Sequence, residues 1–98
     1  ESFFAPAWVK WAQLHYDLED FEKSADIMLS AIDELPEEAD FYYRSAIFLI
    51  KAGQFKEAFH FLESGLILDY DQHVIMFEYL PNLETQKAIF KLIQQYKK

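Results

Sequence analysis

The sequence predicts an all-α fold of about six helices that pair as antiparallel hairpins. Apolar residues recur three and four positions apart along nearly the whole chain, which is the spacing of amphipathic helices. Glycine occurs at only two positions and proline at three, so few residues interrupt these helices. The pattern also repeats after 34 residues, the length of one helix-turn-helix unit. The helices are expected at residues 5–18, 21–35, 38–52, 55–68, 72–79 and 83–96.

The sequence marks the ends of the first three helices. Pro6 suits the first turn of the first helix, where the N–H that proline lacks would have no partner. Glu19 and Asp20 form the polar break before the second helix, which Pro36 then stops. The acidic residues at 37, 38 and 40 favour the start of the third helix, because negative charge is stabilised at a helix N-terminus.

Turn residues also separate the last three helices. Gly53 provides the turn before the fourth helix. The segment Asp69-Tyr70-Asp71 separates the fourth helix from a short fifth one, which halts before Pro81. Asn82 is expected to cap the last helix, and the lysines near the end of the chain suit the negative end of its dipole.

Residues 34 positions apart have matching side chains. The matched pairs are Trp8 and Tyr42, Ala12 and Ala46, Phe21 and Phe55, Ser24 and Ala58, Met28 and Leu62, and Ala31 and Gly65. The small residues allow the two helices of a hairpin to approach closely, and the large residues fill the remaining volume. A third copy begins on the same period, with Met76 and Phe77. Its Ala88 follows Ala58 by only 30 residues, so about one helical turn has been lost near Pro81.

These residues resemble the tetratricopeptide repeat family, whose consensus combines W-x2-L-G-x2-Y with A-x3-F and a final proline. The likeness covers nearly the whole chain, as a single domain of residues 1–98. Repeats are expected at 5–38 and 39–72, and a degenerate capping hairpin at 73–97. The sequence departs from the family at Trp11 and Ser45, where leucine is usual, and at His15, where tyrosine is usual. Because the first residue is Glu1 rather than Met, we expect a fragment of a longer protein.

The resemblance implies a right-handed superhelix whose concave surface is lined by the first helix of each pair. The residues placed there by resemblance are Val9, Gln13, Tyr16, Asp17, Tyr43, Ile47, Ile50, Lys51, Val74 and Phe77. Their aromatic and apolar side chains predict a groove that binds a peptide or helix of a protein partner. Some family members hold the carboxylate terminus of a chaperone with lysine, arginine and asparagine. The corresponding positions here are Val9, Gln13, Tyr43 and Ile47, which disfavours that type of partner.

Two alternatives to partner binding stay open. The same face could be covered by upstream sequence, by the last helix or by a second copy of the chain, which makes self-association or a structural role the second hypothesis. The third hypothesis is a regulatory appendage of a larger protein.

Charge and composition exclude several classes of function. A formal net charge of −8 disfavours nucleic acid and membrane surfaces as partners, because both are anionic. The longest apolar stretch, 46–50, is too short to span a bilayer, so a soluble, cytoplasmic protein is the default expectation. The acidic segments 17–20 and 33–40 are expected to be solvated turns and helix starts, although they could also attract a basic partner.

Nothing in the sequence indicates an enzyme or a cofactor. Cysteine is absent, and His15, His60 and His73 are too scattered to suggest a metal site. No phosphate-binding loop, nucleophile motif or carboxylate pair in an apolar setting is present. We therefore expect neither catalysis nor a bound cofactor or metal.

Overall fold

The computed structural model describes residues 4–82 and 86–97, and the described chain is all-α as predicted. Its helices are α1 (Ala5–Asp17), α2 (Phe21–Glu34), α3 (Ala39–Lys51), α4 (Phe55–Leu68), the 3₁₀ helix η1 (Tyr70–Val74), α5 (Ile75–Tyr79) and α6 (Lys87–Gln95). The first four helices begin and end within one residue of the predicted positions.

The last two helices differ from the prediction. The expected fifth helix starts as the 3₁₀ helix η1 and becomes α-helical only at Ile75. The sixth was expected from Leu83 with Asn82 as its cap, but Leu83 lies outside the described residues and α6 begins at Lys87. Gln86 occupies the N-cap position with φ −95° and ψ 80°, which is not helical, so an α-helix cannot run continuously from 83 to 96.

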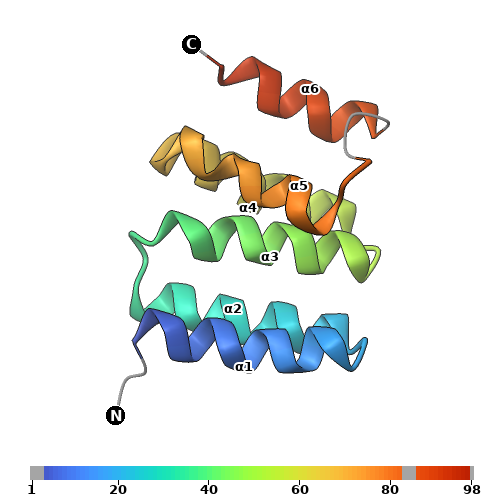
Figure 1. Ribbon diagram of the computed structural model, residues 1–98. Coiled ribbons are helices and arrows are strands. Elements are labelled where there is room, and N and C mark those ends of the chain that lie inside the picture. Colours follow the sequence, from blue (N-terminus) through green and yellow to red (C-terminus); the bar gives the residue numbers. More distant parts are fainter. Residues whose placement is uncertain (1–3, 83–85, 98) are drawn as a thin grey trace.

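Consecutive helices pack against each other in antiparallel order. Contacts join α1 to α2, α2 to α3 and α3 to α4, and α6 packs against α4. Figure 1 shows α1, α3 and α5 along one side of the stack, with α2 and α4 behind them. The helices α1 and α6 lie at opposite ends of the stack. The first two expected hairpins, α1 with α2 and α3 with α4, are therefore present.

The turn between α1 and α2 has the same backbone hydrogen bonds as the turn between α3 and α4. Within each turn, three N–H groups bond back to the preceding helix. They join Leu18 to Leu14, Glu19 to Tyr16 and Asp20 to His15 in the first turn, and Ala52 to Phe48, Gly53 to Ile50 and Gln54 to Leu49 in the second. Every position in the second turn follows its counterpart by 34 residues. The period found in the sequence is thus present in the backbone of both hairpins.

The core is built around α3, which is covered by neighbours on both sides. Its side chains Phe41, Tyr43 and Phe48 are among the largest fully buried ones.

Close helix approach depends on small residues, as expected. The Ser24 hydroxyl of α2 donates a hydrogen bond of 3.0 Å to the Ala12 carbonyl of α1. A Cβ atom at Gly65 of α4 would lie 3.1 Å from the Tyr43 ring, so that ring needs the glycine.

Charge is distributed unevenly along the stack. Residues 4–40, which form the end that includes α1, carry ten acidic and two basic side chains. Residues 86–97, which include α6 at the other end, carry three lysines and no acidic side chain. The two ends of the stack therefore carry net charges of opposite sign, negative at the α1 end and positive at the α6 end.

Candidate functional site

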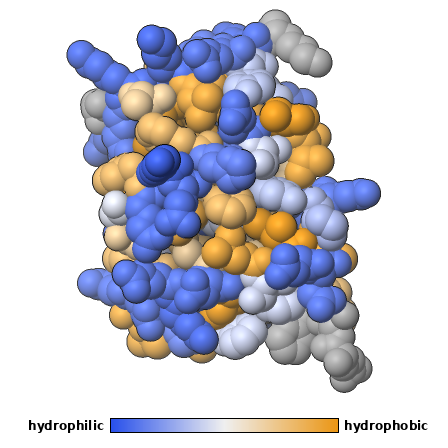
Figure 2. Space-filling model, turned by 180° about the vertical axis from the view of Figure 1, so that it is seen from behind, coloured by the Kyte–Doolittle hydropathy of each residue, from blue (hydrophilic) through white to orange (hydrophobic). Residues whose placement is uncertain are grey.

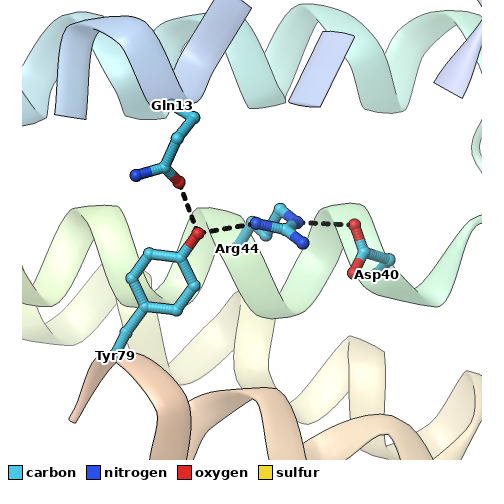
Figure 3. A network of polar contacts seen from close by, with 4 residues as sticks. All are labelled: Gln13, Asp40, Arg44 and Tyr79. Carbon is cyan, nitrogen blue, oxygen red and sulfur yellow. Dashed lines mark hydrogen bonds and ion pairs between the residues drawn. The ribbon is translucent and has the colours of Figure 1, made fainter. Parts of the chain in front are cut away.

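A network of polar side chains joins α1, α3 and α5, the three helices along the side of the stack that is nearest the reader in Figure 1. The Tyr79 hydroxyl of α5 donates a hydrogen bond to the Gln13 side-chain oxygen of α1. The Arg44 guanidinium of α3 donates to the same hydroxyl over 2.8 Å and to the Asp40 carboxylate over 2.7 Å (Figure 3). We call these four residues the cross-helix network. It fixes the relative positions of three helices that are far apart in the sequence.

The charges of the network are paired and partly shielded from water. The Arg44 side chain is 17% exposed and the Asp40 side chain 29%, and the two form an ion pair one helical turn apart. Arg44 also lies over the Tyr79 ring, 5.8 Å from its centroid. Burial raises the pKa of Tyr79 above its ordinary value, although the neighbouring Arg44 partly offsets this effect. The Tyr79 hydroxyl therefore stays protonated and available as a donor.

An aromatic cluster adjoins the network. The Tyr16 ring of α1 lies 5.3 Å from the Phe21 ring, 5.3 Å from the Phe48 ring and 5.2 Å from the Tyr79 ring, between centroids. Tyr16 and Tyr79 meet edge to face, which is a favourable geometry for aromatic rings. Tyr16 remains half-buried, so part of this cluster reaches the surface.

The structure brings together the predicted site residues on α1. Gln13 belongs to the network and donates a hydrogen bond of 2.8 Å to the exposed Asp17 carboxylate. Tyr16 packs on the neighbouring Tyr79 ring. Val9 is half-buried on the same helix. Val9, Gln13 and Tyr16 are spaced four and three residues apart, so they share one side of α1.

Three predicted site residues on α3 are core residues instead. Tyr43 and Ile47 are 0% exposed and Ile50 is 8% exposed. Tyr43 packs against Gly65 of α4, and its hydroxyl donates a hydrogen bond of 2.8 Å to the Asp69 carbonyl. The chain itself covers these side chains, so they cannot line an open groove. Lys51, the fourth predicted residue of α3, is exposed at its end.

Phe77 lies on the side of α5 away from Tyr79, and Val74 is exposed. The residue of α5 that reaches α1 and α3 is Tyr79, which lies about 200° around the helix from Phe77. The Phe77 ring instead packs near His73, with 6.0 Å between centroids. Val74 is exposed in η1. A 3₁₀ helix turns about 20° more per residue than an α-helix, so the five residues of η1 shift the faces of all that follows.

Sequence reasoning missed Asp40, Arg44, Phe48 and Tyr79. One signal was available, because Arg44 is the single arginine of an acidic chain and follows Asp40 by four residues. Nothing in the local sequence indicates that Tyr79 would meet this pair, since its partner on α1 is 66 residues away.

A second surface feature lies between α4 and α6. A groove of ≈ 500 Å³ is lined by Phe59, His60 and Glu63 of α4 and by Ala88, Lys91, Leu92 and Gln95 of α6. The reverse side of the molecule shows apolar side chains among hydrophilic ones (Figure 2). Exposed Phe55 and Ile67 of α4 add to the apolar surface of the chain.

Other kinds of site are not indicated. In the described ranges, 4–82 and 86–97, no helix is long and apolar enough to cross a membrane. Among the same residues, no group of three histidine or acidic side chains is arranged to hold a metal ion.

Comparison with protein-family models, with curated proteins and with solved structures gave no match for this chain. The tetratricopeptide likeness and the superhelix therefore stay predictions based on the repeat pattern.

Proposed function

We propose that this chain is a protein-interaction module that binds an extended peptide or a helix of a partner along the side formed by α1, α3 and α5. The observation that supports this proposal most directly is the cross-helix network. It holds hydrogen-bonding groups from three helices in a fixed, partly exposed row. Groups on rigid helices lose little conformational freedom when a ligand binds, so a row of such groups can bind a peptide at a low cost in entropy.

The chemistry of this side fits a polypeptide ligand. Gln13 offers an amide and Asp17 an exposed carboxylate, which can pair with the backbone or side-chain donors of a peptide. Beside them, the half-buried Tyr16 ring offers apolar contact area. The formal charge of −8 favours basic peptides over nucleic acids or anionic membranes, because long-range attraction steers opposite charges together.

Peptide selection and site-directed variants test this proposal. A phage-displayed random peptide library is selected against the chain, and the Kd of the strongest peptide is measured by calorimetry. We expect Gln13→Ala and Arg44→Ala to raise that Kd about tenfold, as loss of an important contact does. Lys56→Ala, at an exposed position of α4, is the control and should leave the Kd unchanged. Circular dichroism confirms that each variant is folded.

Two outcomes would refute the proposal. The first is a selection that yields no peptide above background. The second is a peptide whose Kd is unaffected in the folded Gln13→Ala and Arg44→Ala variants, since its binding site would then lie elsewhere.

A further inference from the structure

A row of largely exposed apolar side chains runs along α1. The helix itself lies at the end of the stack opposite α6 (Figure 1). The row consists of Ala7, Trp11, Leu14 and Leu18, spaced four, three and four residues apart, so that all four share one face of the helix. Trp11 is 40% exposed, Leu14 57% and Leu18 67%. We call this row the outer stripe. It is a large amount of apolar surface to leave in water on a single helix.

The second hairpin shows what this face is used for inside the stack. The residues 34 positions after Trp11 and Leu14 are Ser45 and Phe48, and both are completely buried. Phe41, the counterpart of Ala7, is completely buried as well. They are covered because α2 packs on α3 and the Tyr16 ring lies 5.3 Å from the Phe48 ring. The same face is therefore a helix-packing face in the second hairpin.

The charges beside the outer stripe suit a second copy of α1. Residues 4–40 as a whole carry ten acidic and two basic side chains, but the charged residues of α1 itself are Lys10 and Asp17, so this helix has a formal charge of zero. A further charge beside the stripe is Lys23 of α2, whose ammonium lies 5.9 Å from the centroid of the Trp11 ring. Lys10 lies four residues before Leu14 and Asp17 three residues after it, on the same edge of the stripe. When two such helices pack antiparallel about a two-fold axis, Lys10 of each copy lies opposite Asp17 of the other.

We propose that the outer stripe is a self-association surface, on which α1 of a second copy packs antiparallel. The apolar side chains of both stripes leave water, and two Lys10 to Asp17 ion pairs form at the edge. This contact is centred on the end of the stack, and Asp17 is the one residue that it shares with the proposed peptide-binding side formed by α1, α3 and α5.

The first test is the solution mass of the chain, measured by sedimentation velocity across a concentration series at physiological salt, which screens the repulsion between the two acidic ends. We expect a monomer–dimer equilibrium that Leu14→Glu shifts by at least about tenfold in Kd, because it buries a charge at the centre of the contact. Ile67→Glu changes an even more exposed apolar residue, on α4, and should dimerise like the native chain. A native chain that is monomeric throughout, or a Leu14→Glu variant that dimerises normally, refutes the proposal.

The second test uses charge reversal to identify the partner helix. Lys10→Glu alone and Asp17→Lys alone should each weaken dimerisation, because each places like charges opposite one another. A mixture of the two variants should form heterodimers about as strongly as the native chain, since opposite charges then meet at both positions. If the mixture associates no better than the separate variants, the antiparallel α1 arrangement is wrong.

Discussion

Glu19 and Gly53 occupy equivalent positions in the two hairpin turns but differ in conformational cost. Both have a positive φ, 61° at Glu19 and 83° at Gly53, and both donate a backbone hydrogen bond to the residue three positions earlier. Glycine adopts this left-handed conformation readily, whereas a residue with a Cβ atom costs roughly 1–2 kcal/mol there. The first turn therefore carries backbone strain that the second turn avoids.

We expect Glu19→Gly to raise the free energy of unfolding by about 1 kcal/mol, since it relieves this strain. The reverse change, Gly53→Ala, should lower it by about the same amount. No atom lies within 4 Å of a Cβ built at Gly53, so that loss would arise from the backbone alone. Urea denaturation measures both values. An unchanged midpoint for Glu19→Gly would show that Glu19 is not strained in solution.

Among the helices, α5 is short and depends on its contacts with other helices. It has five residues, fewer than an isolated helix needs to be stable in water. Its Tyr79 hydroxyl joins both Gln13 of α1 and Arg44 of α3. The Tyr79 side chain thus connects α5 to both of the first two hairpins.

Tyr79→Phe should lower the free energy of unfolding by roughly 1–3 kcal/mol, because it leaves two partly buried polar groups without this partner. Tyr42→Phe is the matched control. Its hydroxyl donates a hydrogen bond to the Pro36 carbonyl at an exposed site, so its loss should cost no more than about 0.5 kcal/mol. Thermal and urea unfolding of the two variants compare these effects. Equal losses in both variants would contradict a linking role for Tyr79.

Helix positions were more predictable than helix orientations. The ends of α1 to α4 follow from local residues such as Pro36 and Gly53, and the sequence places them within one residue. The direction of Tyr43 does not follow from the sequence, because α3 is apolar nearly all round and its periodicity identifies no outer face. The orientation of Tyr79 depends on the 3₁₀ turns of η1, which local sequence patterns do not distinguish from an α-helix.

At the scale of the whole molecule, burial of tyrosines couples stability to alkaline pH. Burial raises the pKa values of Tyr16, Tyr43 and Tyr79 above the ordinary value of 10.0. A raised pKa in the folded state means that folding favours the neutral phenol. The resulting stability is fully present below pH 10 and is lost as the pH rises through the folded-state values.

We therefore expect the free energy of unfolding to fall steeply only above pH 10, with these tyrosines ionising as the chain unfolds. An ultraviolet absorbance titration reports ionisation, and circular dichroism reports helix content in the same samples. The chain unfolded in urea is the control, and its tyrosines should ionise near pH 10. Ionisation of all tyrosines near pH 10 in a chain that keeps its helices would contradict this expectation.

The opposite signs of the two ends give the molecule an electric dipole along the axis of the stack. The acidic residues 4–40 form the negative pole, and the lysine-bearing residues 86–97 form the positive pole. In the field of a highly charged body, such a dipole rotates before any contact is made. A basic body would therefore meet the α1 end first and an acidic body the α6 end, so the direction of approach depends on the sign of the partner's charge.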